Sequence, residues 1–161
     1  MNIMGTRCYI AKEIDNQQYK SIYCQLDGYP EMVGKLLLKH YNTSEKLDSL
    51  LALGDIYVLG EKITPDPGRP HNANESFQKG VTVAYGRDFD GPDFPAEIRT
   101  LDEMIDSDDF IEFVYVFTAN QEWEFSPLLD YDSDFRKLSD ALCKRGFDIG
   151  IDDSAPQMKM E

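Results

Sequence analysis

Two pairs of strand-like segments, each joined by a short polar turn, restrict the fold of this chain most strongly. Residues 6–14 and 19–25 form the first pair, and residues 110–118 and 122–126 form the second. Helical segments lie between the pairs without a regular strand–helix–strand alternation, which predicts an α+β fold. We expect an antiparallel sheet built from hairpins, with helices packed on one face.

Helical segments are expected at residues 31–41, 44–53, 101–105 and 134–144. Thr100 and Ser133 stand at helix starts, where a side-chain oxygen accepts a backbone N–H. Gly54 stands at a helix end, where the backbone turns left-handed. Residues 60–79 and 86–95 are rich in glycine, proline and polar residues, so we expect loops there.

The length of 161 residues predicts a single domain, residues 1–161, with about 151–161 as a loose tail. No apolar run approaches the roughly 18 residues that span a bilayer, and the N-terminus lacks the apolar core of a secretion signal. The chain has three cysteines, an odd number without C-x-x-C spacing, which indicates free thiols: Cys8, Cys24 and Cys143. We therefore expect a cytoplasmic protein without membrane association.

The acidic residues are concentrated in one part of the chain. Residues 86–134 hold 15 Asp and Glu but only Arg87 and Arg99, so this stretch carries −13 of the formal charge of −14. Its dense aromatic residues argue against a disordered acidic tail. Because such a field repels phosphates and anionic lipid, we expect no direct nucleic-acid or membrane binding. A surface that only maintains solubility is the alternative interpretation.

The sequence offers few motifs for catalysis or metal binding. It has neither of the common phosphate-binding glycine motifs, and no spacing supports a Cys–His nucleophilic pair. Residues 130–134 resemble the start of a calcium loop, but Phe135 and Ala141 occupy the positions that require Gly and Glu. Residues 106–109 form a second acidic turn. We expect no metal, no cofactor and no enzymatic activity.

Four short motifs occur in order along the first half of the chain: MGTR at 4–7, IYCQLDGYP at 22–30, LALGD at 51–55 and AYGRD at 84–88. Together they resemble a family of small proteins encoded largely by bacteriophages and prophages, over residues 4–90. Many relatives carry His-Trp where this chain has Gln25-Leu26, so any activity that depends on that histidine would be absent here. The resemblance implies a phage context but no mechanism.

The charge and the resemblance together suggest a phage-encoded inhibitor of a bacterial defence system, of the anti-CRISPR or anti-restriction type. Its partner would be a host defence protein with a basic nucleic-acid channel. Carboxylates would occupy that channel as phosphate mimics, and aromatic side chains would anchor the interface. The candidate partner-binding residues are Asp88, Asp90, Asp93, Glu97, Asp102, Glu103, Asp106, Asp108, Asp109, Glu112, Tyr115, Glu122, Trp123 and Glu124.

Two other functions remain open on the sequence. A small-ligand binder that sequesters a nucleotide signal would bind its phosphates through arginine guanidinium groups. The candidates are Arg7, Arg69, Arg87 and Arg99. The favoured role of Arg87 is nevertheless an ion pair with Asp88. An enzyme of unknown reaction is the third possibility, with His71 or Cys24 as the residues to test. The oligomeric state stays open.

Overall fold

The computed structural model describes residues 5–107, 110–128 and 134–144. The strands are β1 (Arg7–Asp15), β2 (Gln18–Cys24), β3 (Ile56–Val58), β4 (Val83–Ala84), β5 (Glu97–Arg99), β6 (Ile111–Phe117), β7 (Trp123–Pro127) and β8 (Arg136–Lys137). The helices are the π-helical turn η1 (Pro30–Gly34), α1 (Lys35–His40), α2 (Ser44–Leu51), α3 (Tyr85–Asp88), α4 (Leu101–Ile105) and α5 (Leu138–Lys144). The described strands form one sheet in the order β4-β3-β2-β1-β6-β7-β8, and β5 pairs with β2 outside this order.

The two expected hairpins form the centre of the sheet. β1 pairs antiparallel with β2, and β6 pairs antiparallel with β7. The hairpins join through β1 and β6, which run parallel with Ile10 opposite Tyr115. The α+β class and the largely antiparallel sheet are confirmed. The parallel pairs β1–β6 and β2–β3 were outside the prediction, because hairpin signals report only on neighbouring segments.

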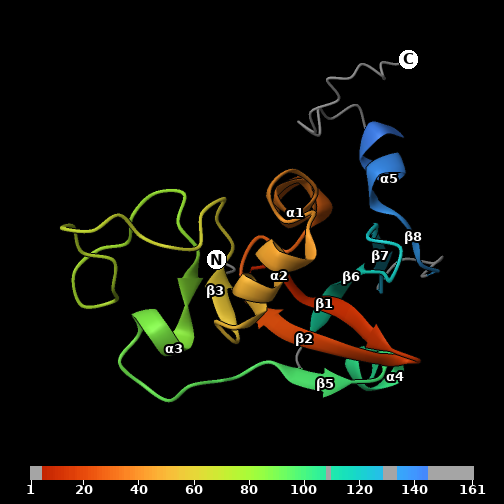
Figure 1. The fold of residues 1–161 in the computed structure, drawn as a ribbon, viewed down its shortest axis with the longest axis horizontal. Helices are drawn as coiled ribbons and strands as arrows, with labels where there is room; N and C mark the ends of the chain where they lie inside the picture. The colour runs from red at the N-terminus through yellow and green to blue at the C-terminus, as the bar shows by residue number, and fades with distance from the viewer. Residues whose placement is uncertain (1–4, 108–109, 129–133, 145–161) are drawn as a thin grey trace.

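Both faces of the sheet are covered. Side chains alternate along β1, so Cys8 and Ile10 belong to one core layer and Tyr9 and Ala11 to the other. Helices α1, α2 and α5 pack on the first layer, as expected, whereas Met104 of α4 packs in the second. Figure 1 shows α1 and α2 above β1 and β2, with α4 below them.

Capping residues set the helix boundaries as their chemistry predicts. Thr43 precedes α2 and its hydroxyl accepts the Lys46 N–H at 3.2 Å. Gly54 follows that helix with a φ of 77°, the left-handed conformation that glycine adopts without strain. Thr100 and Glu103 form a reciprocal capping box at α4. These short-range features depend on neighbouring residues, which is why the sequence predicts them.

Other boundaries differ from the expectation. The predicted helix 31–41 is divided into η1 and α1, with Pro30 at the first position of the π-helical turn. The predicted helix 134–144 begins only at Leu138, because Arg136 and Lys137 pair with β7 as strand β8. The proposed cap Ser133 and the tail 151–161 lie outside the described residues. Within the described ranges, no helix is both long and apolar enough to cross a membrane.

Candidate functional site

Six exposed acidic residues of the middle of the chain follow one border of the molecule. We call residues 89–107 the edge strip; it runs from the end of α3 through β5 to the end of α4 (Figure 1). The strip contains six acidic residues and one basic residue, Arg99. All six acids are exposed: Asp90, Asp93, Glu97, Asp102, Glu103 and Asp106.

Two of these six carboxylates have structural partners. Glu97 accepts from Arg99 at 2.7 Å, and the Arg99 guanidinium also lies 4.8 Å from the centre of the Tyr9 ring. Glu103 accepts the Thr100 N–H at 2.8 Å within the capping box. In the described part of the chain, no hydrogen bond or ion pair holds the other four carboxylates, those of Asp90, Asp93, Asp102 and Asp106.

Large apolar side chains are exposed between the acids of the edge strip. Phe94 is 48% exposed, Ile98 58% and Ile105 42%. Phe94 also packs edge-on against Tyr85, with ring centres 6.1 Å apart. Exposed aromatic and branched side chains next to charges are typical of protein–protein contacts, where desolvated apolar anchors supply much of the binding energy.

The edge strip is fixed to the body of the protein at several points. The Asp55 N–H donates to the Phe94 carbonyl at 2.8 Å, and a Cβ atom at Gly54 would collide with that same carbonyl oxygen. Further along, β5 pairs with β2, with Arg99 opposite Tyr19. The backbone of the strip is therefore held in place by the body of the protein.

Three residues predicted to contact a partner are buried, so this part of the prediction is wrong. The Tyr115 hydroxyl donates to the Gly28 carbonyl at 2.7 Å inside the core. The Trp123 indole donates to the Tyr41 carbonyl at 3.0 Å. Asp88 is also buried. For Tyr115, the continuous apolar run 113–117 was the available signal, because a strand without alternation is covered on both faces.

Asp88 is the centre of a buried network that holds the loop before β4. Its carboxylate accepts the Ala84 N–H at 2.8 Å and two N–H groups of Arg87 at 2.8 and 2.9 Å. Arg87 also donates to the carbonyls of Ile63 and Thr82. The structural ion pair favoured for Arg87 and Asp88 is therefore confirmed.

His71 completes this network and uses both ring nitrogens in it. Its Nδ1 accepts the Gln78 N–H at 2.9 Å, while its Nε2 lies 3.0 Å from the Thr82 carbonyl. Because Nδ1 is the acceptor, Nε2 carries the proton and donates. Cys24 is fully buried, and its thiol lies 3.4 Å from the Leu26 carbonyl. These contacts give both residues structural roles.

Among the described residues, three predicted acids lie outside the edge strip: Glu112, Glu122 and Glu124. Glu112 lies towards one end of the β6–β7 hairpin, beside Leu128, whereas Glu122 and Glu124 lie towards the turn. The Glu122 carboxylate is 3.6 Å from the ammonium of Lys137. Asp108 and Asp109 lie outside the described residues. Six of the fourteen predicted residues therefore lie exposed in the edge strip.

The four candidate arginines are engaged in separate contacts. Arg7 lies over the Phe110 ring at 5.9 Å, and Arg69 pairs with Asp66 at 2.7 Å. Arg87 and Arg99 are held by the contacts already described. Within the described ranges, no group of three or more His, Cys, Asp or Glu is arranged to hold a metal ion.

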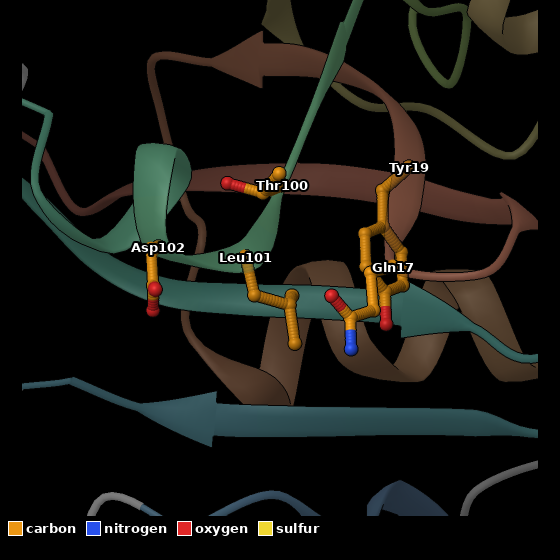
Figure 2. Close-up of a pocket in the computed structure, with 5 residues that line it drawn as sticks. All are labelled: Gln17, Tyr19, Thr100, Leu101 and Asp102. Atoms are coloured by element: carbon orange, nitrogen blue, oxygen red, sulfur yellow. The ribbon is translucent and has the colours of Figure 1, made fainter.

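A pocket of about 290 Å³ lies at one end of the edge strip, where α4 approaches the β1–β2 turn. We call it the Tyr19 pocket; it is lined by Gln17, Tyr19, Thr100, Leu101 and Asp102. Figure 2 shows Gln17 and Tyr19 on one side, Thr100 and Asp102 on the other, and the Leu101 side chain between them. Its lining combines an aromatic ring and a leucine with amide, hydroxyl and carboxylate oxygens.

The electrostatic environment of the pocket is negative. Burial, followed by the charges of Glu13 and Glu124, raises the pKa of Tyr19 above its ordinary value of 10, so its hydroxyl remains neutral at physiological pH. Asp102 adds a third carboxylate from α4. Arg99, the neighbouring cation, is already paired with Glu97. The site therefore favours a cationic group over an anionic one.

Sequence reasoning missed the apolar residues of the edge strip and most of the pocket lining. For the strip, the signal available in the sequence was the presence of apolar residues within a segment rich in Pro, Gly and Asp. No sequence signal brings Gln17 and Tyr19 to α4, because that contact depends on the pairing of β5 with β2.

Comparisons of the chain with protein-family models, with curated proteins and with solved structures find no match.

Proposed function

We propose that this protein is an inhibitory binding protein whose edge strip docks on a positively charged surface of a partner protein. The observation that carries the proposal is the composition of the strip: six exposed carboxylates against one paired arginine, with Phe94, Ile98 and Ile105 exposed among them. Opposite charge accelerates encounter, and the apolar side chains provide contacts that persist after docking.

The spacing of the charges defines how closely the strip imitates nucleic acid. From Asp90 to Glu97 three carboxylates are spread along a segment that spans at most about 25 Å when extended. A DNA strand carries one phosphate per about 3.4 Å, which is a considerably denser array. We therefore propose complementarity to a few lysines and arginines combined with apolar anchoring, rather than a continuous copy of the phosphate backbone.

The partner class follows from this charge and from the motifs. Proteins that hold nucleic acid present basic channels, and an acidic ordered edge is suited to occupy one. The resemblance of residues 4–90 to phage and prophage proteins suggests that the channel belongs to an effector of a bacterial defence system. The protein would then act in the host cytoplasm as an anti-restriction or anti-CRISPR inhibitor.

The two alternative functions receive less support. A nucleotide signal would meet the charges of Asp102, Glu13 and Glu124 at the Tyr19 pocket. Three of the candidate arginines, Arg69, Arg87 and Arg99, are paired with carboxylates elsewhere. An enzyme built on His71 would need a ring nitrogen released from the loop network. Binding rather than turnover is therefore the proposed activity.

The test is a binding assay with purified DNA-cleaving defence effectors across a salt series. Asp90, Asp93, Asp102 and Asp106 are changed together to Asn, which leaves the roles of Glu97 and Glu103 intact. The matched control changes four exposed acids outside the strip to their amides, at Asp15, Glu45, Glu61 and Glu122. We expect wild-type binding to weaken steeply with salt, the strip variant to lose affinity and the control to keep it. Equal loss in both variants would contradict the proposal.

A further inference from the structure

We propose that the Tyr19 pocket receives the head group of an arginine or lysine side chain that projects from the basic partner. This assignment rests on the function proposed above, since it places a specific contact at the α4 end of the edge strip. It adds what the strip alone lacks, which is a partly open hollow where one cationic side chain contacts apolar and acidic groups together.

The lining of the pocket matches both parts of such a side chain. Leu101 and the ring of Tyr19 provide apolar surface for the methylene stem. The Gln17 amide oxygen, the Tyr19 hydroxyl and the Asp102 carboxylate are acceptors for a head group that only donates. Figure 2 shows Gln17 and Tyr19 together on one side, Asp102 on the other and Leu101 between them.

The size of the pocket also favours a side chain. Its volume of about 290 Å³ is at the lower limit of the roughly 300–1,000 Å³ that sites for drug-sized ligands occupy. A nucleotide would therefore extend beyond the pocket onto the acidic surface, whereas a single side chain can enter while the partner backbone remains on the strip.

The surrounding charges select the sign of the occupant. Glu13 of β1 and Glu124 of β7 act on Tyr19 from the sheet, and Asp102 contributes from α4. Arg99 faces the same layer but is held by Glu97 and by the ring of Tyr9. Carboxylates from three elements thus attract a cation, and the guanidinium of Arg99 is already paired with Glu97.

The experiment is a two-dimensional NMR titration of the full chain with N-acetyl-argininamide, with N-acetyl-lysinamide, and with N-acetyl-citrullinamide as the neutral isostere. We expect amide shifts confined to Gln17, Tyr19, Leu101 and their neighbours with the two cations, and much smaller shifts with citrulline. The Asp102→Asn variant should weaken argininamide binding about three- to fivefold. The matched variant Asp93→Asn, elsewhere on the strip, should leave it unchanged.

Several outcomes would overturn the assignment. Equal shifts with citrulline, no effect of Asp102→Asn, or pocket shifts produced by inorganic phosphate would each contradict it. The variant Tyr19→Phe removes one acceptor while retaining the ring, and a weaker affinity for argininamide would support the role of the hydroxyl. If a defence effector binds the edge strip while the pocket signals stay unmoved, the pocket assignment fails and the proposed function stands. If argininamide fills the pocket but no basic effector binds the strip, the proposed function fails instead.

Discussion

Asp88 and His71 lie in direct contact inside the protein, with Oδ2 of the carboxylate 3.3 Å from Nε2 of the imidazole. Both side chains are about 2% exposed, so this contact is formed away from solvent. The pair connects the loop that contains His71 to the short helix α3, from whose end the edge strip departs. The acidic surface therefore begins at a point that a buried charge network holds in place.

Replacing Asp88 with Asn should destabilise the fold by about 2–4 kcal/mol, because it leaves Arg87 without its charged partner. The value lies slightly below that of a fully buried pair, since the Arg87 side chain is 29% exposed. Urea denaturation measures the change, with Asp90→Asn as the exposed control. A loss within about 0.5 kcal/mol, the range of ordinary surface substitutions, would mean that the network is not important for stability.

Replacing Gly54 with Ala should both destabilise the protein and displace the edge strip. The φ of 77° disfavours a side chain, and the added Cβ would collide with the Phe94 carbonyl. We expect a loss of about 2 kcal/mol or more, the left-handed conformation alone accounting for roughly 1–2. Hydrogen exchange should show faster exchange of the Asp55 amide, which donates to Phe94. Gly68→Ala is the control, because that glycine has a similar φ of 82° but open space around it; an equal effect would exclude the collision.

Gln17 has a φ of 65° in the β1–β2 turn, which is unfavourable for a residue with a side chain. Gln17→Gly should therefore raise the unfolding free energy by about 0.5–1 kcal/mol. Gln17→Ala removes the same amide without relieving the backbone and should bring no such gain. Thermal unfolding of the two variants separates these effects, and equal Tm values would show that the turn is not strained.

Alkaline pH should destabilise the protein through Tyr85. Burial, followed by the neighbouring Tyr23 and Tyr57, raises the pKa of Tyr85 to about 12. The folded state keeps this proton while the unfolded phenol loses it near its ordinary value of 10. The stabilisation is thus complete below pH 10 and is lost between pH 10 and about 12.

The corresponding measurement is urea denaturation at pH 9 and pH 11, combined with a phenolate absorbance titration. Tyr85→Phe should reduce the loss of stability between these two pH values, whereas Tyr29→Phe, at an exposed site, should leave it unchanged. Identical pH dependence of wild type and Tyr85→Phe would contradict the assignment.

Features that depend on adjacent residues could be predicted from the sequence, and features that depend on distant pairing could not. The capping box of Thr100 and Glu103 is set by neighbours three residues apart. The burial of Asp88 depends instead on His71 and on the loop around it. The Tyr19 pocket likewise forms only where β5 pairs with β2.

The candidate anchors show a different source of error. The sequence predicts Tyr115 and Trp123 as interface anchors because aromatic side chains dominate interfaces. The same side chains also dominate protein cores. The neighbouring residues distinguish the two roles better. The exposed apolar residues of the edge strip lie next to charged residues or Pro, whereas Tyr115 lies within the apolar run 113–117.

The parallel pairing of β1 with β6 has a consequence for the order in which the protein can assemble. Ile10 meets Tyr115 only after most of the chain has left the ribosome. Until then the first hairpin has an unpaired edge, open to association with other extended segments. Contacts between such distant segments also slow folding, because a long loop must close before they form. Nascent chains of this protein should therefore depend on chaperones until the second hairpin has been synthesised.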